Sequence, residues 1–155
     1  MNLNLQVVIL GEILLAMLLG GVIGFEREVA RKPAGLRTHM LVSGAAALLV
    51  ALGNLIVRSF DVDAPIQHLT SDPIRVLEAV IVGISFLGAG TIFRRKSGDE
   101  VEGLTTAASI LFTAGIGVSV ALSQFILAIG STGMILIVNR VLGRLEDKFI
   151  DRKPE

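Results

Sequence analysis

Long apolar stretches separated by short charged segments dominate the pattern along this chain. They run at roughly 5–25, 39–57, 74–93, 104–121 and 125–141. Each approaches the ~20 residues that an α-helix needs to cross about 30 Å of hydrocarbon. None shows the polar stripe, repeating about every 3.6 residues, that marks the outer side of a helix in a soluble protein. We therefore predict an all-α, polytopic membrane protein with about five transmembrane helices in residues 1–145, followed by a short cytoplasmic tail at 146–155.

The amino-acid composition supports a membrane protein. The chain has 155 residues, of which 52% are hydrophobic and only 18% are charged, and its mean hydropathy is +0.74. Its 14 basic and 14 acidic residues balance, so no net charge attracts nucleic acid. The chain has no Cys, which excludes disulfides, thiolate metal sites and a Cys nucleophile.

Basic residues are concentrated in alternate loops of this predicted bundle. Twelve of the 14 Lys and Arg residues follow the first, third and fifth apolar stretches, and only Arg58 and Arg75 lie elsewhere. Because short loops rich in Lys and Arg stay in the cytoplasm, we place the N-terminus outside and the C-terminus inside. The first stretch lacks a basic leader and a small-residue cleavage pattern, so we expect it to be retained as a helix.

The first predicted cytoplasmic loop, at 26–38, contains residues beyond the Lys and Arg that would orient the protein in the membrane. Lys and Arg alone would anchor it to the anionic inner leaflet, whereas this loop also contains a Pro-Ala-Gly break at 33–35. Arginines here can instead bind a phospholipid headgroup, a phosphate-bearing ligand or a partner's carboxylate, and the glutamates of the loop can equally pair with those arginines. The candidate binding residues at this face are Glu26, Arg27, Glu28, Lys32, Pro33, Gly35, Arg37 and Thr38, together with Arg94 of the next cytoplasmic loop.

Polar residues inside the apolar stretches form a second candidate set, comprising Glu12, Glu78, Ser85, Thr105, Ser109 and Thr113. Glu12 begins a helix face that continues with small residues every four positions, so we expect it to point into the bundle. It either serves a function there or only reaches water at the outer interface. Glu78 follows Arg75 by three positions, and we favour a local ion pair. The hydroxyls of the fourth stretch recur every four residues; they either bond back to carbonyls one turn earlier or line a groove that accepts cations.

Glycines indicate close helix packing. The candidate packing residues are Gly20 and Gly24 in the first helix and Gly83, Gly88 and Gly90 in the third. Small residues let helix backbones approach one another within or between chains, which favours a homodimer. The glycines of the third helix equally suit a broken helix that exposes carbonyls to an ion, as in transporters.

The sequence also contains a candidate internal repeat. A Gly-rich helix end, a charged loop and a Gly-Leu-x-Thr motif occur first around 24–38 and again around 88–106. We therefore hypothesise that the first two helices repeat as the third and fourth about an axis along the membrane normal. This repeat would place segments 35–38 and 103–106 side by side.

Four segments carry a resemblance to a known family: GGVIGFERE at 20–28, KPAGLRTHMLVSGAAAL at 32–48, DPIRVLEAVIVGISFLGAGTIFR at 72–94 and VEGLTTAASI at 101–110. In this order they resemble the N-terminal membrane domain of the MgtC/SapB family, which includes the YhiD type. The resemblance implies a bacterial inner-membrane protein of several spans that acts in adaptation to stress such as low magnesium or acid. It implies no settled biochemical activity.

Two departures favour the short SapB or YhiD type. Thr105 stands where MgtC-type members have Asn in the GLNTAA stretch. Only about 14 residues follow Val141, without the cytoplasmic C-terminal domain of MgtC-type members. We therefore expect no role that depends on that domain.

No motif supports catalysis. With two His and neither an H-E-x-x-H zinc motif nor a G-x-S-x-G nucleophile motif, we predict no enzyme, no assigned metal site and no cofactor. Two hypotheses remain: a regulatory or scaffold protein that contacts other membrane complexes, and a small cation transporter or channel linked to magnesium. The expected partners are the lipid bilayer, a second copy of the chain and another membrane protein complex, but not nucleic acid.

Overall fold

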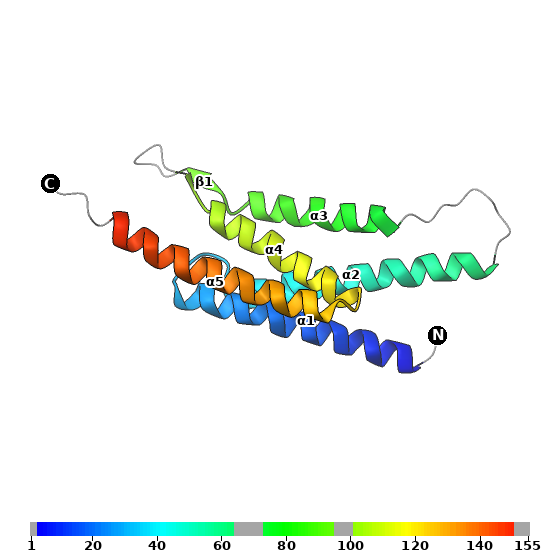
Figure 1. The fold of residues 1–155 in the computed structure, drawn as a ribbon. Helices are drawn as coiled ribbons and strands as arrows, with labels where there is room; N and C mark the ends of the chain where they lie inside the picture. Colours follow the sequence, from blue (N-terminus) through cyan, green and yellow to red (C-terminus); the bar gives the residue numbers. More distant parts are fainter. Residues whose placement is uncertain (1–2, 64–72, 95–100, 151–155) are drawn as a thin grey trace.

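The computed structural model describes residues 3–63, 73–94 and 101–150. In chain order, its elements are α1 (Leu3–Val29), α2 (Leu36–Asp63), α3 (Pro73–Ala89), β1 (Phe93–Arg94), β2 (Val101–Glu102), α4 (Leu104–Ala121) and α5 (Phe125–Ile150). Successive helices run in opposite directions, so the C-terminal ends of α1, α3 and α5 lie at the same end of the bundle (Figure 1). The predicted all-α architecture is confirmed, with a single short hairpin in the described part of the chain.

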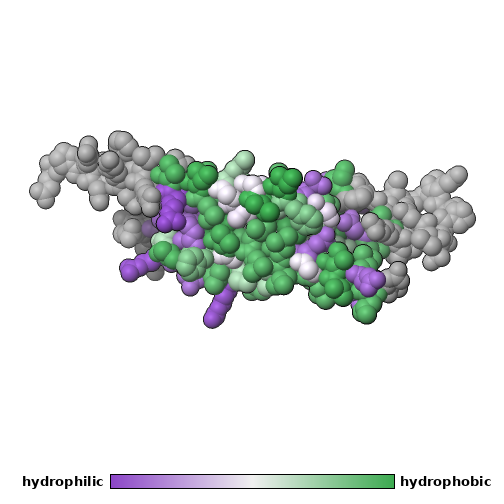
Figure 2. Space-filling model, turned by 60° about the horizontal axis from the view of Figure 1, so that its bottom comes forward, coloured by the Kyte–Doolittle hydropathy of each residue, from purple (hydrophilic) through white to green (hydrophobic). Residues whose placement is uncertain are grey.

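The lengths of the apolar helices fit a membrane. By length and composition, three described helices can cross a membrane, namely Leu3–Val29, Leu36–Val57 within α2, and Leu104–Ala121. The segment Phe125–Val141 of α5 is also apolar but shorter. Figure 2 shows the matching surface, an apolar band over the middle of the bundle with hydrophilic residues toward both ends. Because large apolar side chains exposed over such a band require a non-aqueous solvent, the chain is a membrane protein.

The third helix is shorter than the sequence pattern predicts. The apolar stretch continues to about residue 93, but α3 has 17 residues and ends at Ala89. Thr91 donates both its amide N–H and its hydroxyl to the carbonyl of Gly88, which closes a turn directly after the helix. A hydropathy pattern does not predict this turn, because the residues around it are small or apolar and do not interrupt the apolar stretch.

Three helices form the centre of the bundle. α1, α2 and α4 pack against one another, α3 lies against α2 and α4, and α5 lies against α1 and α4. One buried apolar cluster includes Ala16, Ile23, Ala47, Ile116, Val120, Ala128 and Ile135. A second includes Val42, Ala46, Val50, Val80, Ile110, Ala114 and Val118. The first cluster joins α5 to the three central helices, and the second joins α3 to α2 and α4.

The central helices touch through their backbones at Ser43. A Cβ added to Gly20 would lie 2.8 Å from the Cβ of Ser43, and one added to Gly117 would overlap the Ser43 carbonyl oxygen. Contacts this short exclude any side chain larger than hydrogen. We refer to this place as the Ser43 crossing.

The remaining predicted packing glycines fall into two groups. Gly24 packs against the backbone of Gly35, and Gly88 is in ordinary contact with Ala107 of α4. Gly83 and Gly90 are exposed, and a Cβ added to Gly83 would meet nothing within 4 Å. Gly83 therefore makes no packing contact within the described chain, because it lies on the side of α3 that faces away from α2 and α4. A packing role for Gly83 between chains stays a prediction.

The two halves of the predicted repeat are connected differently. A tight turn joins α1 to α2, whereas β1 and β2 pair antiparallel between α3 and α4, with Arg94 opposite Val101. The side chain of Arg94 lies outside the described residues. Both connections lie at the same end of the bundle (Figure 1), and the superposition of the two helical pairs stays a prediction.

The Ser43 crossing predicts a strong effect of Gly117→Leu. The leucine must displace the backbone of α2, and overpacking of this kind costs about 1–3 kcal/mol of the free energy of unfolding. We expect a lower midpoint when the protein is heated in detergent and the remaining monodisperse fraction is measured by size exclusion. The control is Gly115→Leu in the same helix, where an added Cβ meets nothing within 4 Å. Equal midpoints for the two variants would contradict the crossing.

Candidate functional site

Polar side chains are buried inside the bundle next to the Ser43 crossing. The buried polar residues are Arg27, His39, Ser43, Thr106, Ser109, Thr113 and Thr132. A bilayer offers no water to such groups, so they need partners within the protein. Among the described residues, Arg27 Nε and Ser43 Oγ have none. We call Arg27, His39, Thr106 and Ser109 the polar core, because hydrogen bonds join them in pairs across α1, α2 and α4.

Arg27 is the charged member of the polar core. It is only 4% exposed, and its Nη2 donates to Thr106 Oγ1 at 3.4 Å. Its Nε has no hydrogen-bond partner among the described residues. A guanidinium keeps its charge when buried, and a buried charge with incomplete hydrogen bonding is costly. Arg27 therefore keeps one buried donor without an acceptor among the described residues.

His39 joins the first turn of α2 to α4. The ring is fully buried, with Nδ1 3.1 Å from the Gly35 carbonyl oxygen and Nε2 3.2 Å from Ser109 Oγ. A carbonyl only accepts hydrogen bonds, so Nδ1 carries the proton and donates it. In the neutral ring, Nε2 then accepts from the Ser109 hydroxyl. The sequence shows a lone His at a helix start and gives no sign of this role.

The predicted hydroxyl stripe of α4 is displaced by one residue at its start. Thr113 Oγ1 donates to the Ser109 carbonyl one turn earlier at 2.8 Å, which agrees with the bonding-back alternative. Thr105 is exposed, whereas Thr106 is buried and contacts Arg27. Both threonines lie about one turn before Ser109 in a helix of about 3.6 residues per turn. Only the position of α1 decides which of them faces the core.

A groove opens between α1 and α5 beside the polar core. Its volume is about 570 Å³, and it is lined by Val22, Phe25, Glu26, Arg27, Val29, Ala30, Lys32, Leu136, Asn139, Arg140 and Gly143. We call it the α1–α5 groove. Three of its side chains are cationic and one is a carboxylate, Glu26, whose Oε2 accepts from Asn139 Nδ2 at 3.1 Å. The groove thus has a net positive charge, and its residues from α5 were not among the sequence candidates.

The turn between α1 and α2 is built by local hydrogen bonds. Lys32 N–H donates to the Arg27 carbonyl and Arg31 N–H to the Glu28 carbonyl, with Arg31 in the left-handed region at φ 54°. This Schellman motif ends α1. Leu36 N–H donates to Glu28 Oε2 at 2.9 Å, so Glu28 caps the start of α2, where a negative charge is favoured.

The predicted loop residues therefore have different places. Glu28 acts as a cap, and Gly35 makes room for it, since an added Cβ would lie 2.8 Å from Glu28 Oε2. Pro33 and Arg37 are exposed and Thr38 is half-buried. Of the predicted loop candidates, the groove is lined by Glu26, Arg27 and Lys32.

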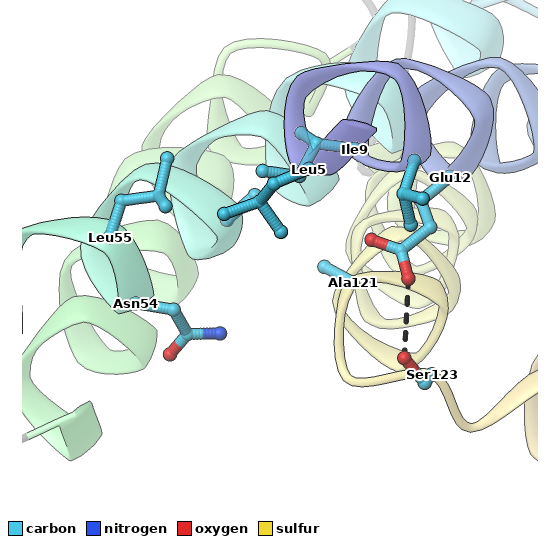
Figure 3. A pocket seen from close by; sticks show the side chains of 9 residues that line it. Leu5, Ile9, Glu12, Asn54, Leu55, Ala121 and Ser123 are labelled. Atoms are coloured by element: carbon cyan, nitrogen blue, oxygen red, sulfur yellow. Dashed lines mark hydrogen bonds between the residues drawn. The ribbon is translucent and has the colours of Figure 1, made fainter. Parts of the chain in front are cut away.

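Glu12 lies at the opposite end of the bundle. It is half-buried and accepts a hydrogen bond of 3.2 Å from Ser123 Oγ in the turn between α4 and α5 (Figure 3). Both line a cavity of about 220 Å³ that Asn54 also lines. The Asn54 amide points toward this space (Figure 3). The Glu12 carboxylate thus shares a cavity lined mostly by apolar residues with two other polar side chains, Asn54 and Ser123.

The polar candidates of α3 lie on the outside. Glu78 and Ser85 are exposed, and the described side chains include no ion pair between Glu78 and Arg75. The expected local pair is therefore absent from this structure, because no neighbouring helix holds these two exposed side chains in place. Nor do the described residues bring three His, Asp or Glu side chains close enough to hold a metal ion.

Together, the apolar band, the three helices long enough to cross a bilayer and the buried polar core define an all-α membrane protein. Residues 13–148 match the profile of the MgtC family. The chain belongs to the MgtC family, as the four sequence segments indicated.

The chain is similar to relatives that extend beyond the matched region. It is 37% identical over 151 residues to an uncharacterized protein of Haemophilus influenzae, covering 97% of this chain and 61% of the relative. It is 34% identical over 141 residues to the putative magnesium transporter YhiD of Escherichia coli, covering 91% and 63%. It is 41% identical over 131 residues to the protein MgtC of Salmonella typhimurium, covering 84% and 51%. The chain thus spans about half to two thirds of the length of these relatives, and no solved structure matches it.

Adjacent threonines give a matched test of the polar core. Thr106→Val removes the acceptor of Arg27 and leaves a buried guanidinium with fewer partners, which costs about 1–3 kcal/mol. Thr105→Val changes an exposed side chain in the same way, so we expect a much smaller effect. Thermal midpoints of both variants in detergent make the comparison. A larger loss in Thr105→Val would show that the wrong threonine has been placed in the core.

Proposed function

We propose that the chain forms the membrane domain of a multi-pass bacterial inner-membrane protein that acts in adaptation to stress such as low magnesium or acid. In this proposal it works by binding other membrane components and not by catalysing a reaction. Membership of the MgtC family supports the setting. In α5, an added Cβ would meet nothing within 4 Å at the exposed Gly130 or at the half-buried Gly133. These glycines would let a second copy approach closely, so the proposal includes a homodimer.

The observation that carries this proposal is the Ser43 crossing. An ion path along the interface of α1, α2 and α4 would have to pass backbone contacts at Gly20 and Gly117. The buried charge beside the crossing is the guanidinium of Arg27, which repels a cation. Binding therefore fits the described geometry better than conduction.

A cation transporter is the second candidate. Glu12 and Asn54 share a cavity at one end of the bundle, and oxygen ligands of this kind suit a hard cation such as Mg²⁺. A relative at 34% identity is named a putative magnesium transporter. A transporter would need the Glu12 carboxylate to bind the cation, whereas a binding protein would not.

Magnesium flux into proteoliposomes separates the two. The purified full chain is reconstituted beside Glu12→Gln and a matched control, Glu78→Gln, which removes an exposed carboxylate of α3. We expect no flux above empty liposomes from any of the three, provided that each elutes as one folded species. Saturable flux that Glu12→Gln abolishes and Glu78→Gln preserves would establish the transporter instead.

Crosslinking in cells tests the binding role directly. The chain has no Cys, so a single Arg37→Cys introduces a unique attachment point on the exposed first turn of α2. We expect a discrete crosslinked adduct with a membrane component under low magnesium. The control is Val82→Cys on the outer side of α3, which is 68% exposed. The same adducts from both positions would argue against a specific contact at the turn.

A further inference from the structure

The α1–α5 groove carries an unmatched positive charge. Arg27, Lys32 and Arg140 line it, and the one carboxylate, Glu26, is already bonded to Asn139. Arg27 is 4% exposed, and its Nε has no partner among the described residues. An anion bound in the groove would compensate the buried charge of Arg27 and accept hydrogen bonds from Lys32 and Arg140.

The position of the groove indicates where that anion comes from. Arg140 lies next to Val141, at which the apolar part of α5 ends, and Arg27 lies two residues before the end of α1. Both cations are therefore at the depth where hydrocarbon gives way to lipid headgroups. Basic pockets between helices at this level bind anionic headgroups.

The walls of the groove favour a lipid over a free ion. Val22 and Phe25 line it and are 49% and 61% exposed, and Leu136 lines it from α5. A free phosphate ion gains nothing from these side chains, whereas an acyl chain buries apolar surface against them. The lipid phosphate and the acyl chain would thus each find complementary groups.

We propose that the α1–α5 groove binds one anionic phospholipid, with its phosphate at Arg27, Lys32 and Arg140 and an acyl chain along Val22 and Phe25. The site goes beyond the proposed function, since it holds whether the protein acts by binding partners or by transport. It also explains why a cationic side chain is buried at the end of α1 although the described residues give it no ion pair within contact distance.

Native mass spectrometry of the full chain in neutral detergent tests this proposal. Phosphatidylglycerol is titrated beside phosphatidylcholine of the same acyl chains and beside inorganic phosphate. We expect one saturable phosphatidylglycerol site, with phosphatidylcholine about tenfold weaker and no competition from inorganic phosphate. Equal binding of the two lipids would overturn the proposal, and so would displacement of the lipid by phosphate at equal concentration.

Two pairs of variants locate the site. Arg140→Gln should weaken phosphatidylglycerol binding about fivefold, the factor expected for one cationic residue near the membrane surface. Its control, Arg37→Gln, removes an exposed cation outside the groove and should leave binding unchanged. A similar loss in both would show attraction by general surface charge and overturn the site.

The second pair changes shape and not charge. An added Cβ at Gly143 meets nothing within 4 Å, so Gly143→Leu can fold while filling part of the groove. We expect it to abolish the saturable site. Gly115→Leu, at an equally open glycine of α4 outside the groove, should retain it. Retention of the lipid in Gly143→Leu would overturn the proposal.

Discussion

The structure depends on the backbone contact of three helices at Ser43. In a bilayer, lipid tails are as apolar as the helices, so no hydrophobic force drives the helices together and close packing must do so. Gly20 of α1 and Gly117 of α4 supply this packing by presenting no side chain to α2. With the three central helices fixed in this way, α3 and α5 pack on the outside through the two apolar clusters.

The same contact divides the polar groups of the molecule. On one side lies the polar core, where Arg27 meets Thr106 and His39 meets Ser109. On the other side lies the cavity of Glu12 and Asn54. The Ser43 crossing therefore separates these two polar regions, and the proposed binding role rests on this separation.

The tight turn between α1 and α2 links local structure to the groove. Because Gly24 packs against the backbone of Gly35, α2 must begin close to the end of α1, and the chain reverses within a few residues. The Schellman motif at Arg31 and the Glu28 cap make this reversal possible. One result is that Lys32 joins Arg27 in the groove wall, where α5 adds the third cation.

The sequence by itself determined the helical class, the number of helices in the described chain, the start of each helix to within about three residues and the small-residue face around Gly20. These depend on local periodicity and on hydropathy, which a helix expresses whatever its neighbours are. Tertiary structure alone decided that Thr106 and not Thr105 is buried, that Gly83 faces outward, and that Asn139 meets Glu26 across 113 positions of sequence. Periodicity states which residues share a helix face, but only the approach of another backbone decides which face is covered.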